Sequence, residues 1–251
     1  MSTFALKMVA LLLMVIDHVG YFFDGAPVWF RWLGRGSYPL FLFCLVWGYH
    51  YTRDRRKYLL RLYGMSVFMT VFMLAVEVWF PAGRDLGYHN IFLPMFLVGF
   101  LISTIETFAA DRRKGAVMLG ALCGVQLLYY ILPGFIPGLR QLSGDILTGI
   151  IPNLAINEYG FPFIALGVLL YFVRENRAML CATYLLFCMY QLSAEMLEYG
   201  MAVQWMMIIA LPFMMQYNKQ EGYGMKYAFY VFYPAHVFVL FYLANFVMDK
   251  G

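Results

Sequence analysis

Long apolar runs follow one another along the whole chain and are separated by short polar stretches. They lie at about 4–23, 36–52, 57–80, 89–110, 115–132, 158–174, 178–193, 201–216 and 226–248. Each run approaches the ~20 residues that an α-helix needs to cross a bilayer. The pattern therefore predicts an all-α integral membrane protein, a single domain over residues 1–251 with about nine transmembrane helices.

One stretch interrupts this pattern, between the fifth and the sixth run. Glycines and prolines punctuate residues 133–157, and the apolar part from Asp145 to Ile156 is too short to span without help. We expect an interfacial or re-entrant segment over 143–157. A crossing there would reverse the direction of every later helix.

The composition supports a membrane bundle. Hydrophobic residues make up 63% of the chain, charged residues only 13%, and the mean hydropathy is +0.70. Soluble domains carry roughly a quarter charged residues, so a soluble fold is excluded.

Lysines and arginines gather in every second loop. These loops and their edges hold Arg53, Arg55, Arg56, Lys57, Arg112, Arg113, Lys114, Arg174, Arg177, Lys219 and Lys226. The opposite side has fewer, namely Arg31, Arg35, Arg84, Arg140 and Lys250. Because basic residues concentrate in cytoplasmic loops, we expect the N-terminus in the cytoplasm and the C-terminus outside. The basic loops thus indicate topology, and no nucleic-acid partner is expected.

The first apolar run contains ionisable residues, which are costly in a membrane and therefore candidates for function. Lys7 and His18 lie about three helical turns apart, on nearly one face and separated by roughly 16 Å along the axis. Lys7 would sit at the cytoplasmic mouth and His18 deeper. This spacing suits an elongated anionic ligand such as acyl-CoA, with phosphates near the cation and the thioester near the imidazole. Alternatively, Lys7 only extends to the membrane interface.

Three further polar residues are candidates for the same site. Asp17 is offset by about 100° from His18, so we expect it to face another helix and to pair with Arg35. His236 follows Pro234 in the last run, where the proline frees a carbonyl and marks a polar break facing the bundle interior.

Several kinds of site are not supported by the sequence. The cysteines Cys44, Cys123, Cys181 and Cys188 fall in apolar runs with neither metal-ligand nor disulfide spacing. Walker A, H-E-x-x-H, G-x-S-x-G and S-x-x-K motifs are missing from the sequence. No metal is therefore expected.

The motifs around these residues resemble those of the TraX family. The resemblance rests on ordered segments over most of the chain: 11–18 ending in Asp17-His18, 33–41 with Gly-Arg-Gly-Ser-Tyr-Pro-Leu-Phe, 45–48, Asn90-Ile91, Tyr159-Gly160 and 232–236. It implies acetylation of the N-terminal amine of a conjugative pilin, with acetyl-CoA as donor. It also implies a multi-pass protein of the bacterial inner membrane. TraX-like sequences are distantly similar to membrane acyltransferases with Arg-x10-His in their first helix, with Lys7 here in place of the arginine.

These observations combine into one mechanistic hypothesis. Acetyl-CoA would place its phosphates near Lys7 and the basic loop Arg53, Arg55, Arg56 and Lys57. His18 would act as general base on the acceptor. Arg35 or His236 would stabilise the oxyanion, and Asp17 would hold the local charge. An acetyl-histidine intermediate is an alternative route.

Other functions remain open from the sequence. The acceptor is a pilin-like peptide amine or, alternatively, a hydroxyl of a cell-surface glycan or lipid. From another class, a small transporter could use Asp17, His18, Glu77 and His236 as a proton relay, although no inverted repeat supports it. A non-catalytic membrane subunit is the last alternative.

Overall fold

The computed structural model describes residues 1–142, 144–224 and 226–248, and in these residues all regular structure is helical. Its contacts group the chain into two compact units. Unit 1 comprises Met1–Gly48, Ala82–Leu86 and Phe172–Gly251, and unit 2 comprises Tyr49–Pro81 and Gly87–Tyr171. The prediction of a single domain stays a prediction.

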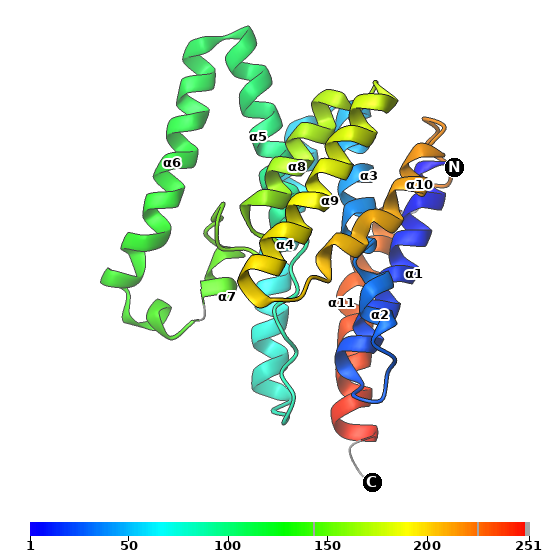
Figure 1. Ribbon diagram of the computed structural model, residues 1–251. Helices are drawn as coiled ribbons and strands as arrows, with labels where there is room; N and C mark the ends of the chain where they lie inside the picture. The colour runs from blue at the N-terminus through cyan, green and yellow to red at the C-terminus, as the bar shows by residue number, and fades with distance from the viewer. Residues whose placement is uncertain (143, 225, 249–251) are drawn as a thin grey trace. The chain divides into compact units, whose positions relative to one another are not determined.

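Every predicted apolar run contains a helix, but the helices differ in length (Figure 1). Six are long and apolar enough to cross a membrane: α1 (Thr3–Phe22), α4 (Arg55–Trp79), α5 (Phe92–Ala110), α6 (Arg112–Phe135), α9 (Arg177–Tyr199) and Tyr227–Val247. The last of these joins α11 (Lys226–Tyr242) to the π-helical η3 (Leu243–Val247).

The three remaining runs form shorter helices: α3 (Ser37–Tyr51), α8 (Gly160–Val173), and η2 (Gln204–Ala210) followed by α10 (Leu211–Met215). The total of about nine spans and the direction of insertion therefore stay predictions. Of the basic residues used for that direction, Lys250 lies outside the described residues, as do the side chains of Arg140 and Lys226.

Polar residues in the loops begin several of the long helices. Ser2, Asp54, Asp111 and Asn176 each accept a hydrogen bond from a backbone N–H in the first turn of the helix that follows. These bonds satisfy donors that have no partner within the helix. The backbone N–H of Lys57 accordingly holds the pKa of the Asp54 carboxyl below its usual range.

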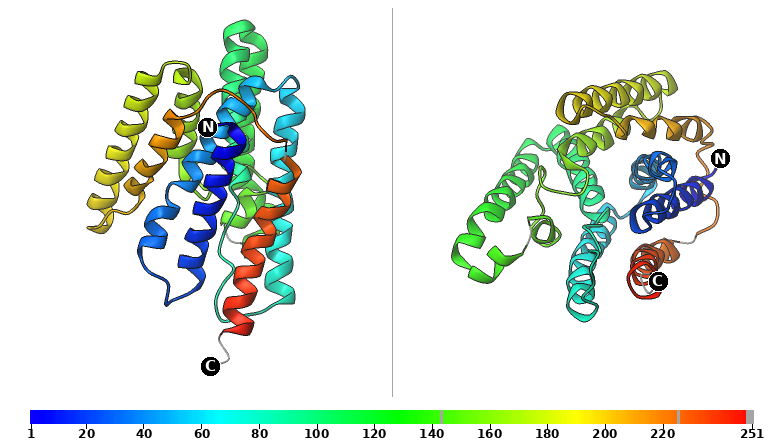
Figure 2. Two further views of the ribbon diagram at one scale, coloured as in Figure 1. Left: turned by 90° about the vertical axis from the view of Figure 1, so that its right-hand side faces the viewer. Right: turned by 60° about the horizontal axis from the view of Figure 1, so that its bottom comes forward.

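In unit 1, α1 and α11 run side by side in the same direction (Figure 2). Near their N-terminal ends, Nζ of Lys7 lies 5.2 Å from the ring centre of Phe229. Near their C-terminal ends, the rings of Phe22 and Phe241 meet edge to face at 6.4 Å. Lys7 and Phe22, about four turns apart on α1, therefore meet residues in the same order on α11.

A loop residue ties the C-terminal ends of this helix pair together. The guanidinium of Arg84 donates to the Asp24 carboxylate and to the Phe22 carbonyl at the end of α1. The main chain of Arg84 also exchanges hydrogen bonds with the side-chain amide of Asn245 in η3. Both helix ends are thereby fixed to the short segment Ala82–Leu86.

Unit 2 holds the stretch that we expected not to span. It begins with α7 (Gly144–Thr148), a single helical turn, and continues as non-helical backbone. Ser66 of α4 donates to the Gly149 carbonyl, and the Gln126 amide of α6 bonds both the Pro152 carbonyl and the Leu154 N–H. Irregular backbone is tolerated at membrane depth only where protein groups satisfy it, and these hydrogen bonds meet that requirement. No spanning helix forms over these described residues.

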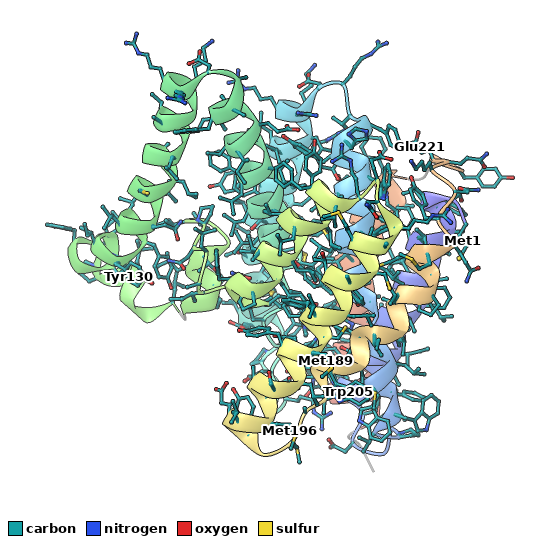
Figure 3. The ribbon with its side chains drawn as sticks, turned by 45° about the horizontal axis from the view of Figure 1, so that its top comes forward. Met1, Tyr130, Met189, Met196, Trp205 and Glu221 are labelled. Atoms are coloured by element: carbon teal, nitrogen blue, oxygen red, sulfur yellow. The ribbon has the colours of Figure 1, made fainter. Side chains whose placement is uncertain are left out.

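The long helices present apolar side chains on their outer surfaces (Figure 3). Tyr130 on α6 is 62% exposed, and on α9 Met189 is 61% and Met196 50% exposed. Side chains of this kind on helices of spanning length are suited to contact with lipid acyl chains.

Candidate functional site

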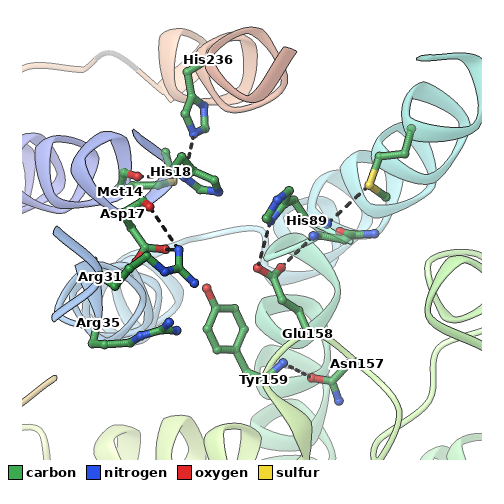
Figure 4. A network of polar contacts seen from close by, with 12 residues as sticks. Met14, Asp17, His18, Arg31, Arg35, His89, Asn157, Glu158, Tyr159 and His236 are labelled. Carbon is green, nitrogen blue, oxygen red and sulfur yellow. Dashed lines mark hydrogen bonds and ion pairs between the residues drawn. The ribbon is translucent and has the colours of Figure 1, made fainter. Parts of the chain in front are cut away.

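The centre of the site is a pair of histidines in unit 1 (Figure 4). His18 on α1 and His236 on α11 are both buried, and Nε2 of His236 lies 3.3 Å from Nδ1 of His18. Their rings meet edge to face, with centres 4.9 Å apart. The parallel α1–α11 arrangement thus brings into contact two residues that the sequence predicted for one site.

Backbone carbonyls determine where the protons of this pair reside. Nδ1 of His18 lies 2.8 Å from the Met14 carbonyl, and Nδ1 of His236 lies 3.0 Å from the Phe232 carbonyl. A carbonyl oxygen only accepts, so both Nδ1 atoms are donors and both neutral rings carry their lone pair on Nε2. The His18 Nδ1 proton is shared between the Met14 carbonyl and Nε2 of His236. His18 is thereby oriented as a base through Nε2.

The predicted pairing of Asp17 with Arg35 is wrong. Asp17 pairs with Arg31 on α2 (Trp29–Gly34) rather than with Arg35, with 2.8 Å between Nη1 and Oδ2. The same nitrogen donates to the Asp17 carbonyl at 3.1 Å. Arg31 lies one turn before Arg35 and so faces α1, whereas Arg35 caps the end of α2. Both side chains of the pair are partly buried.

Glycines allow α2 and its neighbours to lie this close to α1. A Cβ on Gly34 would be 2.2 Å from the Cβ and Oδ1 atoms of Asp17, and one on Gly36 would be 2.7 Å from Ile209. The next residue, Ser37, donates to the Ala10 carbonyl at 2.8 Å. The glycines of the Gly-Arg-Gly motif are therefore contact positions on α1 and η2.

Arg35 is held differently from Arg31. Its Nη1 lies 3.4 Å from Oε1 of Gln204, and its Nε is buried without a hydrogen-bond partner in the part of the chain that the structure describes. Gln204 is itself fixed, since its backbone N–H donates to Glu195 at 2.8 Å. No carboxylate pairs with Arg35 over those same residues, so its charge is available to an anion.

Lys7 is fixed over an aromatic ring. Its ammonium lies 5.2 Å from the Phe229 ring centre, which is a cation–π distance, and the side chain is half-buried. Lys7 and His18 occupy one helix, α1, which fixes their separation at about three turns. The role of Lys7 in donor binding stays a prediction.

The basic loop in unit 2 divides into exposed side chains and side chains that form ion pairs. Arg53 and Arg56 are exposed, and Lys57 pairs with Asp54 at 3.1 Å. Arg55 forms an ion pair with Glu106, and its guanidinium lies 4.9 Å from the Tyr49 ring centre. The Glu106 carboxylate also accepts a hydrogen bond from the Tyr171 hydroxyl. Arg55 therefore has a clear structural role at the junction of α4, α5 and α8, and Arg53 and Arg56 are better suited to a ligand.

Unit 2 also contains a polar cluster whose acidic member the sequence did not single out. Glu158, just before α8, accepts from the Asn90 N–H at 2.7 Å and lies 3.8 Å from Nδ1 of His89 (Figure 4). The side-chain carbonyl of Asn90 accepts from the Leu93 N–H in the first turn of α5. The available signal for Glu158 in the sequence was a carboxylate at the start of an apolar run.

Arg31, Gln204 and Glu195 were also missed as members of the site. Arg31 was counted only among the basic residues of the non-cytoplasmic loops, because polar side chains at helix ends are common and do not by themselves indicate a site. Across the described ranges, no group of three or more histidines, cysteines and carboxylates has metal-site geometry.

Comparison with known proteins places the chain in a family. The family model described as TraX protein matches residues 2–138 and 146–244. Protein TraX of Escherichia coli is 32% identical over 122 residues, covering 47% of this chain and 46% of that protein. Protein TraX of strain K12 is 32% identical over 123 residues, covering the same shares.

A relative with a different name matches over nearly its whole length. The probable fimbrial assembly protein FimC, serogroup H1, of Dichelobacter nodosus is 27% identical over 255 residues, 95% of this chain and 94% of that protein. The match spans about half the length of the Escherichia coli proteins, and no solved structure matches. The family model covers most of the chain and the helices are of membrane-spanning length, so this multi-pass bacterial membrane protein belongs to the TraX family.

Proposed function

We propose that this protein is a membrane-embedded acetyltransferase that transfers the acetyl group of acetyl-CoA to an amine. The observation that carries the proposal is the His18–His236 pair, buried and oriented by the Met14 and Phe232 carbonyls. Burying two coupled imidazoles in an apolar bundle is costly unless they serve a purpose, and a base with its lone pair directed through Nε2 is a general-base arrangement.

In the proposed reaction, the neutral amine attacks the thioester carbonyl while Nε2 of His18 takes a proton from its nitrogen. The new C–N bond forms, the C–S bond breaks, and the coenzyme A thiolate takes the proton from His18. The products are the acetamide and coenzyme A, and His18 returns to its neutral form. His236 contributes by accepting from Nδ1 of His18, a bond that strengthens when His18 becomes an imidazolium.

Arg35 is the better of the two groups suggested for the oxyanion. The lone pair of His236 is directed at His18. Arg35 is a cation without a carboxylate partner among the residues described, and its buried Nε is a donor in need of an acceptor. A developing oxyanion would supply that acceptor. Asp17, paired with Arg31, then keeps the second arginine neutralised and holds α2 on the turn of α1 that carries His18.

The donor is assigned from charge and spacing. Lys7 lies on the same helix as His18, about 16 Å away, which suits phosphates at one end and a thioester at the other. In unit 2, the exposed Arg53 and Arg56 are separate candidates for binding a phosphate.

The acceptor is assigned from the family resemblance. The TraX resemblance implies a pilin N-terminal amine, and the full-length relative is named as a probable fimbrial assembly protein. Both point to a pilin-like peptide in preference to a surface glycan.

The test uses the purified full chain in lipid nanodiscs with acetyl-CoA and a pilin-derived peptide. We expect saturable donor binding that Lys7→Ala weakens about tenfold, and acetyl transfer that His18→Ala lowers by about 10²–10⁴-fold. His50→Ala is the matched control, because His50 lies on α3 outside the site and should leave both unchanged. Normal transfer by folded His18→Ala protein would refute the mechanism. Acetylated glycan without acetylated peptide would move the acceptor to a hydroxyl, and proton-coupled flux without donor binding would identify a transporter.

A further inference from the structure

Glu158 in unit 2 is a carboxylate held in place by a backbone N–H and lying beside an imidazole. Its side chain is 16% exposed, and its polar contacts are the Asn90 N–H at 2.7 Å and Nδ1 of His89 at 3.8 Å. The longer contact exceeds hydrogen-bond length, and an imidazole is charged only when protonated. No lysine or arginine pairs with Glu158 in the described ranges.

The groups around Glu158 are rigid. Asn90 is completely buried, and its amide donates to the carbonyl and hydroxyl of Ser66 at 3.0 and 3.2 Å. Its carbonyl oxygen accepts from the Leu93 N–H. All polar groups of the Asn90 side chain are engaged, so its backbone N–H holds Oε2 of Glu158 in one position and leaves Oε1 beside His89.

An ionised carboxylate that is largely removed from water is stabilised by a cation much more than by a single neutral donor. The remaining neighbours along the chain, Asn153 and Asn157, are neutral and bonded to the local backbone. Glu158 therefore provides a pre-positioned carboxylate among hydrogen-bonding groups, with the His89 imidazole as its nearest basic side chain. A primary ammonium, with one full charge and three donors, matches it.

A purely structural role is the competing explanation. Glu158 accepts from Asn90 and thereby anchors the start of α8 to the start of α5. A glutamine could do the same, because its amide oxygen is also an acceptor. The anchoring role needs only a hydrogen-bond acceptor, whereas cation binding needs the negative charge of the carboxylate. The substitution Glu158→Gln separates the two roles.

We infer that Glu158, beside His89, is a binding site for a primary ammonium group, and that it recognises the acceptor by its amine. The inference rests on the proposed function for the identity of that amine, and it names an amine rather than a hydroxyl as the acceptor class. Binding at Glu158 is a property of unit 2 and is separate from the deprotonation and transfer that follow.

The experiment measures peptide binding without acetyl-CoA, using the full chain in nanodiscs. The probe is an apolar decapeptide with a free N-terminal amine, compared with the same peptide carrying an N-terminal acetyl group. We expect Glu158→Gln to weaken binding of the free-amine peptide at least about tenfold and to leave the weaker binding of the acetylated peptide unchanged. Glu77→Gln, an exposed carboxylate of the same unit, is the matched control and should change neither.

The outcomes separate this inference from the proposed function. Equal binding of the free-amine peptide by the wild type and Glu158→Gln would overturn the ammonium site, even if acetyl transfer still depended on His18. Loss of thermal stability in Glu158→Gln together with equal loss of binding of both peptides would show anchoring alone and also overturn it. Selective loss of free-amine binding with no acetyl transfer by the wild type would retain the ammonium site and refute the transferase.

Discussion

Nε2 of His236 faces Nδ1 of His18 at 3.3 Å, although 218 residues separate them in the chain. Each ring is also bonded to the carbonyl four residues earlier in its own helix. The pair therefore depends on the relative translation of α1 and α11, and a shift of one residue along either helix, about 1.5 Å, would separate the two nitrogens.

The first prediction concerns this contact. His236→Ala removes the acceptor that strengthens as His18 becomes protonated, so kcat for acetyl transfer should fall about 10²-fold while the affinity for acetyl-CoA changes little. Steady-state kinetics and donor titration check the two quantities. An equal loss of affinity would indicate that His236 binds the donor instead.

The second prediction concerns the close contact of α2 with α1. Gly34→Ala should destabilise the protein by about 1–3 kcal/mol, because the new Cβ overlaps Asp17 and must displace it. Gly64→Ala in α4 is the control, since nothing lies within 4 Å of its Cβ position and alanine favours the helix. Thermal unfolding in detergent should give a lower Tm for Gly34→Ala and an equal or higher Tm for Gly64→Ala.

The third prediction concerns the Asp17–Arg31 pair. Arg31→Gln should cost about 1–3 kcal/mol, less than for a fully buried pair because both side chains keep some exposure. Adding Asp17→Asn should recover part of this loss, since no unpaired charge remains. A double-mutant cycle of thermal stabilities measures the coupling, and strictly additive losses would show that the two side chains do not interact. Arg35→Gln should show no such coupling to Asp17.

A fourth prediction concerns Gln126 on α6. Its side-chain amide satisfies the Pro152 carbonyl and the Leu154 N–H, so Gln126→Leu leaves both without a partner. We expect a loss of about 2–6 kcal/mol, the sum for two unsatisfied groups. Hydrogen exchange should rise first at Leu154 and its neighbours. A stability equal to that of the wild type would mean that water or lipid headgroups reach this backbone.

The sequence was sufficient to predict the features that depend on composition and on the length of the apolar runs. Apolar run length predicted where the helices lie, and the cost of burying charge singled out His18 and His236 before either was seen to contact the other.

Features that depend on how the helices are oriented could not be predicted from the sequence as well. Asp17 was assigned to Arg35 because membrane level alone does not distinguish two arginines one turn apart, and α2 was not anticipated as a separate helix. Glu158 escaped notice because its significance comes from the Asn90 N–H, which is distant in the chain. Three of the apolar runs gave helices shorter than a full span for a similar reason, since hydropathy does not show where a helix ends.

The irregular segment after α7 has a consequence for biogenesis. A helix can enter the bilayer alone because its own backbone bonds are complete, but the backbone around Gly149, Pro152 and Leu154 is completed only by Ser66 and Gln126. Those side chains belong to α4 and α6, which precede it in synthesis. We therefore expect this segment to become buried only after α4 and α6 have packed together, as a late step in the assembly of unit 2.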